Sequence, residues 1–204
     1  MRRWVRGFIV VMVTSGSWAQ SVSAAAAFRQ DFVRRLVNAA TERTNHAVRY
    51  DGAYVRIAYP GGDVPADTGV CTDEIIRVYR AVGVDLQKEV HEDMVANFAA
   101  YPRTWHRSSP DSNIDHRRVP NLMTFFARKG ETLPVTQRSS DYQPGDLVTY
   151  DLGGNVPHIG IVVDQKGASR AYMIVHNIGQ GPRMEDVLFR WQITGHYRYY
   201  GPKA

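Results

Sequence analysis

The sequence predicts an α+β domain, with helices in its first half and an antiparallel sheet in its second half. Apolar residues recur at helical spacing early in the chain, whereas short β-rich runs divided by Gly, Asp and Asn turns follow Pro144. The 204 residues, 44% hydrophobic and 22% charged, suit one domain with a substantial core.

The N-terminus predicts a signal peptide. Arg2, Arg3 and Arg6 precede a short apolar run over residues 7–13, and small residues follow as far as Ala27. We therefore expect export across the inner membrane to the periplasm or cell envelope. The alternative is a short N-terminal helix that stays attached.

Two tripeptides that end in alanine, residues 17–19 and 22–24, are typical of signal-peptidase sites. We assign residues 1–24 to the leader, with the cut between 19 and 26, and residues 27–204 to a single hydrolase domain.

The charge balance does not favour nucleic acid as a partner. The chain has 25 basic and 20 acidic residues, and removal of the three leader arginines leaves 22 against 20, a net charge of +2. Such a weak excess is compatible with a polyanionic cell wall. No stretch of the mature chain predicts a transmembrane segment, and we expect a monomer.

Helical spacing predicts four helices, over residues 28–44, 71–82, 92–99 and 120–130. The first has apolar residues on one face and Arg and Glu on the other. The second follows a loop rich in Pro and Gly and ends at Gly83, a typical C-cap. The third and fourth flank a polar, irregular loop around residues 110–118.

The second half predicts four short strands, over residues 147–150, 158–163, 172–176 and 196–200. They are rich in Val, Ile and Tyr and are separated by turn residues.

The chain contains one cysteine, Cys71, so it cannot form an intrachain disulfide. A lone cysteine in an exported protein is either an inert buried side chain or a nucleophile. Cys71 lies where the Thr68-Gly69 turn leads into a helix. A helix N-terminus lowers a thiol pKa, and its free N–H groups suit an oxyanion.

A thiol nucleophile also needs an imidazole from elsewhere in the fold. His158 opens one predicted strand and His176 closes the next, so the two are expected to be neighbours across the sheet. His158 is the expected base, and His176 the residue that holds its tautomer. The alternative is a pair of ordinary strand histidines.

A cysteine at a helix start, Pro-Gly-Asp-Leu-Val at 144–148, His-Ile-Gly-Ile-Val-Val at 158–163 and a strand closing in histidine together resemble the NlpC/p60 branch of papain-like cysteine peptidases. The resemblance covers residues 59–177. It implies a papain-like fold and hydrolysis through a thioester acyl-enzyme, without a cofactor. It also implies peptidoglycan or its muropeptides as partners, with cleavage in the stem peptide.

Carried over residue by residue, the resemblance makes Cys71 the nucleophile, His158 the base and His176 the third residue. It also places Tyr59 beside the active site, although Tyr59 packing over a loop is the alternative. Asn177 is the alternative third residue.

Four stretches, over residues 59–65, 69–73, 113–121 and 176–179, resemble more specifically the domain-of-unknown-function family 1287. This second resemblance spans nearly the whole mature chain.

Asp73 departs from the Asp-Cys-Ser-Gly pattern of the wider family. It suits the helix dipole but opposes ionisation of a neighbouring thiol, unless it points away towards solvent or the central loop. In that loop, His116, Arg117 and Arg118 are expected near the cleft, where an arginine fork would bind stem-peptide carboxylates. The alternative is that the arginines pair with Asp111 or Asp115.

Two rival interpretations remain open. The first is a metal site in the middle of the chain, but the spacing of its candidate ligands matches no strong metal signature, so no metal is expected. These candidates are His91, Glu92, Asp93, His106, Asp115 and His116. The second is a non-catalytic wall-binding protein. An amidase or acyltransferase on the same fold is a further alternative.

Overall fold

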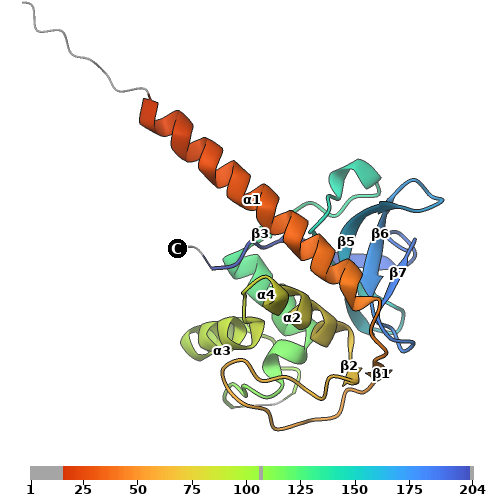
Figure 1. Ribbon diagram of the computed structural model, residues 1–204. Coiled ribbons are helices and arrows are strands. Elements are labelled where there is room, and N and C mark those ends of the chain that lie inside the picture. The colour runs from red at the N-terminus through yellow and green to blue at the C-terminus, as the bar shows by residue number, and fades with distance from the viewer. Residues whose placement is uncertain (1–15, 106–107, 203–204) are drawn as a thin grey trace, which may run out of the picture.

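The structure is a computed structural model that describes residues 16–105 and 108–202, with side chains described from Ala24 onward. It confirms the α+β class: helices lie against one side of an antiparallel sheet (Figure 1). The helices are α1 (Gly16–Arg43), α2 (Cys71–Ala81), α3 (Leu86–Asn97) and α4 (Val119–Lys129), with short 3-10 turns η1 (Phe98–Ala100), η2 (Asp115–Arg117) and η3 (Ser139–Asp141).

The strands are β1 (Arg49–Tyr50), β2 (Thr68–Gly69), β3 (Glu131–Thr132), β4 (Leu147–Asp151), β5 (Pro157–Lys166), β6 (Tyr172–His176), β7 (Arg183–Glu185) and β8 (Gln192–Arg198). β1 and β2 form a small parallel pair, and the other six form one sheet in the order β3-β8-β4-β5-β6-β7. Every neighbouring pair in the larger sheet is antiparallel.

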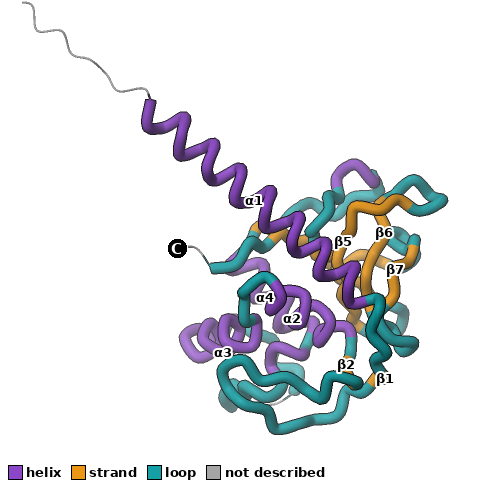
Figure 2. Tube along the Cα trace, viewed as in Figure 1, coloured by secondary structure: helices purple, strands orange, loops and turns teal. Residues whose placement is uncertain are grey.

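Helix α1 begins at Gly16, well before Phe28, because the alanines of residues 24–27 favour helix. Phe32, Leu36 and Ala40 bury its C-terminal half in the core, whereas its N-terminal half extends beyond the body (Figure 2). The predicted cleavage region lies within α1. Arg2, Arg3, Arg6 and the apolar run lie outside the described residues, so the signal peptide stays a prediction.

Helix α2 is the central helix, since its residues 71–79 are all buried. Its start is fixed by Asp73, whose carboxylate accepts the Val70 N–H at 2.7 Å. Helix α3 begins at Leu86, six residues before the expected Glu92. Asp85 caps it by accepting the Gln87 N–H at 3.1 Å, a signal that the apolar pattern did not include.

The sheet separates two cores by alternation of side chains along β5. Ile159, Ile161 and Val163 pack against the helices, in the same core as Cys71. Val162 packs on the other side, with Tyr150 and Ile174.

Strand β7 was not expected, and β8 begins at Gln192, before the expected start of the last strand. No helix in the described part of the chain combines the length and apolar character that a membrane crossing needs.

Candidate active site

Cys71 is the first residue of α2, directly after β2, and only 4% of its surface is exposed. Backbone N–H groups surround its sulfur. Hydrogen bonds from the N–H groups of Ile159, Thr72 and Cys71 itself each act to lower the thiol pKa. The thiol therefore lies at the start of β5, beside the residue that follows His158.

Burial outweighs these N–H groups and raises the pKa of the Cys71 thiol to about 12, with a smaller contribution from the charge of Asp73. The helix N-terminus therefore acts in the expected direction, but the expected low thiol pKa is wrong, because burial outweighs it. A thiolate in a dry site loses more hydration than three N–H groups restore. The resting site holds a protonated thiol.

His158 and His176 form a buried imidazole pair, each 1% exposed. His158 Nε2 lies 3.0 Å from His176 Nδ1, and the rings meet edge to face with centroids 5.1 Å apart. Burial lowers the pKa of His158 to about 3, and His176 adds to this effect. Burial also lowers the pKa of His176, although the Glu185 carboxylate opposes that shift. Both rings are neutral at pH 7.

Glu185 extends the pair, because its Oε2 lies 2.9 Å from His176 Nε2. We assign the His176 proton to Nε2, because that nitrogen faces a carboxylate, which only accepts; the Nδ1 of His176 then accepts the Nε2–H of His158. His158 Nδ1 is then left with a free lone pair, which is what a general base requires. Sequence reasoning missed Glu185 because β7 has three residues, too few for a periodic signal.

Trp191 covers the imidazole pair. Its ring centroid lies 5.9 Å from that of His176 and 6.3 Å from that of His158, and it also packs edge to face on Tyr150. This apolar wall excludes water, which explains the lowered pKa values of the two rings. Sequence reasoning missed Trp191, since a single tryptophan between turns carries no pattern.

Among the described residues, no hydrogen bond joins Cys71 to the His158 ring. Alternation along β5 turns His158 towards Trp191 and turns Ile159 towards the core of Cys71. The two groups are adjacent through the Ile159 N–H instead. In ligand-free sites, catalytic hydrogen bonds are often long and shorten only with substrate bound.

The tyrosine beside the thiol is Tyr50, not Tyr59. Partial burial raises the pKa of Tyr50 to about 12, with contributions from the charges of Cys71 and Asp73 and from a hydrogen bond to Cys71. Tyr59 packs edge to face on His91 at 4.9 Å and is 42% exposed. The pairing of β1 with β2 delivers Tyr50 to the site, and two-residue strands give no sequence signal.

Arg117 is not available to bind a substrate carboxylate. Its guanidinium pairs with both oxygens of Asp73, at 2.7 and 3.0 Å, and donates to the carbonyls of Ala53 and Asp51. Only 6% of Arg117 is exposed. Asp73 therefore points to the central loop, one of the alternatives, and ties that loop to the start of α2.

The other accessory candidates have partners outside the imidazole pair. Arg118 pairs with Asp115 at 3.3 Å, one of the expected alternatives, and stacks on Trp105. It also lines a cavity of about 370 Å³ that reaches Val70, next to Cys71. His116 is 2% exposed, and burial lowers its pKa to about 3. Asn177 is buried and accepts the Gly179 N–H at 3.0 Å, so His176 is the residue that meets His158.

Across residues 16–105 and 108–202, no group of three or more His, Cys, Asp or Glu is arranged to hold a metal ion. Asp93, one of the candidate ligands, instead meets Tyr101, Arg128 and Lys129. His106 lies outside the described residues.

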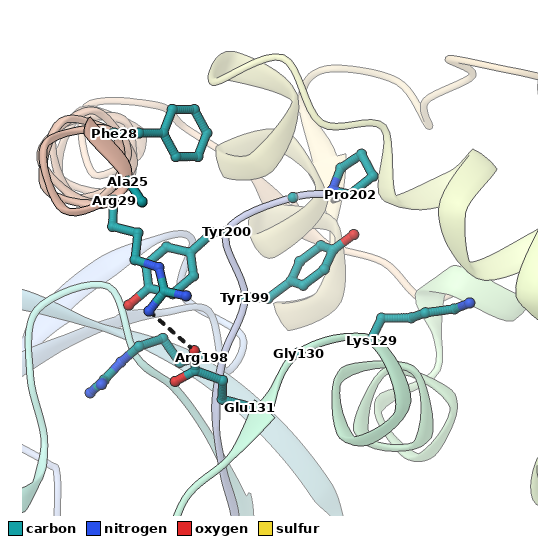
Figure 3. Close-up of a pocket in the computed structure, with 11 residues that line it drawn as sticks. Ala25, Phe28, Arg29, Lys129, Gly130, Glu131, Arg198, Tyr199, Tyr200 and Pro202 are labelled. Atoms are coloured by element: carbon teal, nitrogen blue, oxygen red, sulfur yellow. Dashed lines mark ion pairs between the residues drawn. The ribbon is translucent and has the colours of Figure 1, made fainter. Parts of the chain in front are cut away.

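A separate cavity of about 380 Å³ lies beside residues 25–29 of α1 (Figure 3). The rings of Phe28, Tyr199 and Tyr200 line it, and Arg29 pairs with Glu131 at 3.6 Å. None of its lining residues belongs to the site of Cys71, so the two are distinct.

The comparisons with known proteins agree with the resemblance drawn from the motifs. The family described as "Domain of unknown function (DUF1287)" matches residues 37–199. The uncharacterized protein YijF of Escherichia coli (strain K12) is 50% identical over 165 residues, which cover 81% of this chain and 80% of that protein.

Two solved structures are also similar, NlpC2 and NlpC1 from Trichomonas vaginalis, each at 15% identity and with TM-scores of 0.45 and 0.43. The similarity covers 82% and 83% of this chain but 46% and 44% of those chains. This chain thus corresponds to less than half of either structure.

Proposed function

The chain belongs to the family of the domain of unknown function 1287, and from this membership and the imidazole pair beside Cys71 we propose that it is a cysteine hydrolase. We propose further that it is exported and cuts peptide bonds in the stem peptides of peptidoglycan. The line of contacts from Glu185, 2.9 Å from His176 Nε2, through His176 to His158 is the observation that supports the proposal.

These contacts give Glu185, His176 and His158 one role each. Because Glu185 fixes the proton of His176, the lone pair of His158 Nδ1 is free to take the thiol proton as Cys71 attacks the substrate carbonyl. The imidazolium that forms is stabilised by His176 and, through it, by Glu185. A purely structural pair of strand histidines does not need a carboxylate that fixes the direction of the protons.

The raised pKa of Cys71 and the lowered pKa of His158 mean that the resting pair is neutral. Proton transfer then accompanies attack, once substrate has brought the two groups together. The N–H groups around the sulfur and the Tyr50 hydroxyl are suitable donors for the oxyanion of the tetrahedral intermediate. Collapse of that intermediate forms a thioester, and the departing amine takes the proton from His158. Water then hydrolyses the thioester.

The substrate class rests on the predicted signal peptide and on the NlpC/p60 resemblance of the motifs. Both favour the cell envelope, and the resemblance favours peptidoglycan stem peptides as the substrate there.

The test is to incubate the purified protein and its Cys71→Ser variant with purified peptidoglycan and identify the products by mass spectrometry. We expect wild-type protein to release peptides cut within the stem and the variant to release none, because a serine hydroxyl is barely ionised in a site built for sulfur. Equal release by both proteins, or no release by either, contradicts the proposal. Cleavage between glycan and peptide identifies an amidase instead.

A further inference from the structure

We propose that a cavity beside the imidazole pair is a subsite for a substrate carboxylate, with Arg183 and Arg190 as its donors. The inference rests on the proposed function, because it assigns part of the substrate of the same site. We call this cavity the arginine cavity. It is lined by His176, Ile178, Gln180, Gly181, Arg183, Glu185 and Arg190, and its volume is about 200 Å³.

The arginine cavity lies next to His176 and Glu185. His176 faces His158 through Nδ1 and Glu185 through Nε2, so the cavity lies on the side of His176 away from His158. A ligand there lies beside the group that positions the base, and so within the span of a short peptide whose scissile bond is at Cys71.

The lining residue Gly181 also packs against the segment that precedes Tyr50. At Gly181, φ is +82°, and an added Cβ would lie 3.3 Å from the carbonyl oxygen of Val48. This close approach packs the loop after β6 against the segment that leads into Tyr50, which contacts Cys71. The cavity and the thiol are thus connected through both β6 and β1.

The charges of the cavity favour an anion. Within the described residues, neither Arg183 nor Arg190 has a carboxylate within ion-pair distance, whereas the buried Arg77 and Arg117 are both paired. Glu185 is the one acidic group of the lining, and it is engaged with His176. Two guanidinium groups against one carboxylate leave an excess positive charge beside a neutral imidazole.

The geometry suits a carboxylate at the end of a short side chain or peptide. Arg190 stands over the Trp191 ring at 5.3 Å, which restrains its guanidinium before a ligand arrives. The planar fork of arginine matches a carboxylate through two hydrogen bonds. Gln180 offers an amide donor, and the exposed Ile178 an apolar edge. A volume of about 200 Å³ is enough for one amino-acid side chain that ends in a carboxylate.

The proposed carboxylate site lies at β7 and the turn before β8. The sequence predicts it instead in the central loop, around residues 110–118. Arg117, the earlier candidate, is fully used by Asp73 and two backbone carbonyls. Arg183 and Arg190 are exposed, so their replacement does not disturb the core.

The experiment measures binding without turnover. In the full-length Cys71→Ser background, calorimetry compares a peptidoglycan stem tetrapeptide that has free carboxylates with the same peptide fully amidated. We expect the free peptide to bind at least about tenfold more tightly. Arg183→Ala and Arg190→Ala should each weaken its binding by about ten- to a hundredfold and leave the amidated peptide unaffected. Arg35→Ala, which removes an exposed arginine of α1, is the matched control.

Equal affinity for the two peptides, no measurable binding of either, or unchanged binding in both arginine variants overturns the subsite. A turnover assay with cysteine-intact proteins separates the two proposals. If the binding pattern holds but wild-type protein cuts no peptide, the subsite stands and the hydrolase function fails. If wild-type protein cuts both peptides with equal kcat/KM, the hydrolase stands and the subsite fails. Circular dichroism confirms that each variant is folded.

Discussion

The Nε2 of His158 and the Nδ1 of His176 lie 3.0 Å apart, and one hydrogen lies between them. A neutral imidazole has one N–H, so the direction of this bond depends on where the second ring keeps its own proton. Glu185, 2.9 Å from His176 Nε2, decides that position. Glu185 therefore influences the tautomer of His158, although it contacts only His176 of the pair.

Replacing Glu185 by Gln should lower kcat by about tenfold or more, because an amide either donates or accepts and no longer fixes the tautomer of His176. Steady-state kinetics on a peptide without carboxylates separates this effect from ligand binding in the arginine cavity, and KM should change little. Nitrogen NMR of the His176 ring gives an independent reading, since the Nε2–H fraction should fall. Asp186→Asn is the matched control: this neighbouring carboxylate bonds Ser169 and should leave kcat unchanged. A wild-type kcat in Glu185→Gln would remove Glu185 from the mechanism.

His176→Ala should reduce kcat strongly, though less than His158→Ala, because a group that orients the base contributes less than the base itself. Asn177→Ala should be much milder, since the Asn177 side chain bonds Gly179 rather than His158. The three variants are compared by their kcat values. The reverse order, with Asn177→Ala worse than His176→Ala, would make Asn177 the third residue.

Cys71 should react slowly with iodoacetamide at pH 6 to 7 in the folded protein. Its pKa is raised to about 12, so only a minute thiolate fraction exists there, and the rate should climb steadily as the pH rises from 8 to 10. The same protein unfolded in guanidinium, with an ordinary thiol pKa, is the control and should react much faster at pH 7. Fast labelling of folded protein near pH 6 would show a preformed thiolate and so contradict the neutral resting pair.

Arg117→Ala should lower the free energy of unfolding by about 3–5 kcal/mol, because it leaves the buried Asp73 carboxylate without its partner. Chemical denaturation measures the change. Arg35→Ala is the control: Arg35 is exposed on α1, and its loss should cost little. A double variant, Asp73→Ala with Arg117→Ala, should cost less than the sum of the two single changes. Additive losses would show that the two side chains do not stabilise each other.

A fusion of the first thirty residues to a reporter should reach the periplasm or the medium and lose its leader. Cell fractionation and the mass of the exported reporter measure both. Replacing Arg2, Arg3 and Arg6 by uncharged residues gives the control, which should be exported poorly. Retention of the intact fusion in the cytoplasm would contradict the export prediction.

The sequence by itself determined the groups whose signals are local. Cys71 stands at the junction of a turn and an amphipathic helix, and His158 and His176 stand at the ends of β-rich runs, so their positions follow from neighbouring residues. The order of helices and strands was predictable for the same reason, except where a strand was too short to repeat a pattern or a cap was overlooked, as at β7 and Asp85.

Tertiary structure alone decided the surroundings of these groups. Glu185 and Tyr50 reach the site on strands of three and two residues, and Arg117 meets Asp73 across 44 positions of the chain. The protonation of the site is equally nonlocal. Burial by α2, the sheet and Trp191 sets the pKa values of Cys71 and His158, because desolvation depends on every atom packed around a group and not on its neighbours in sequence.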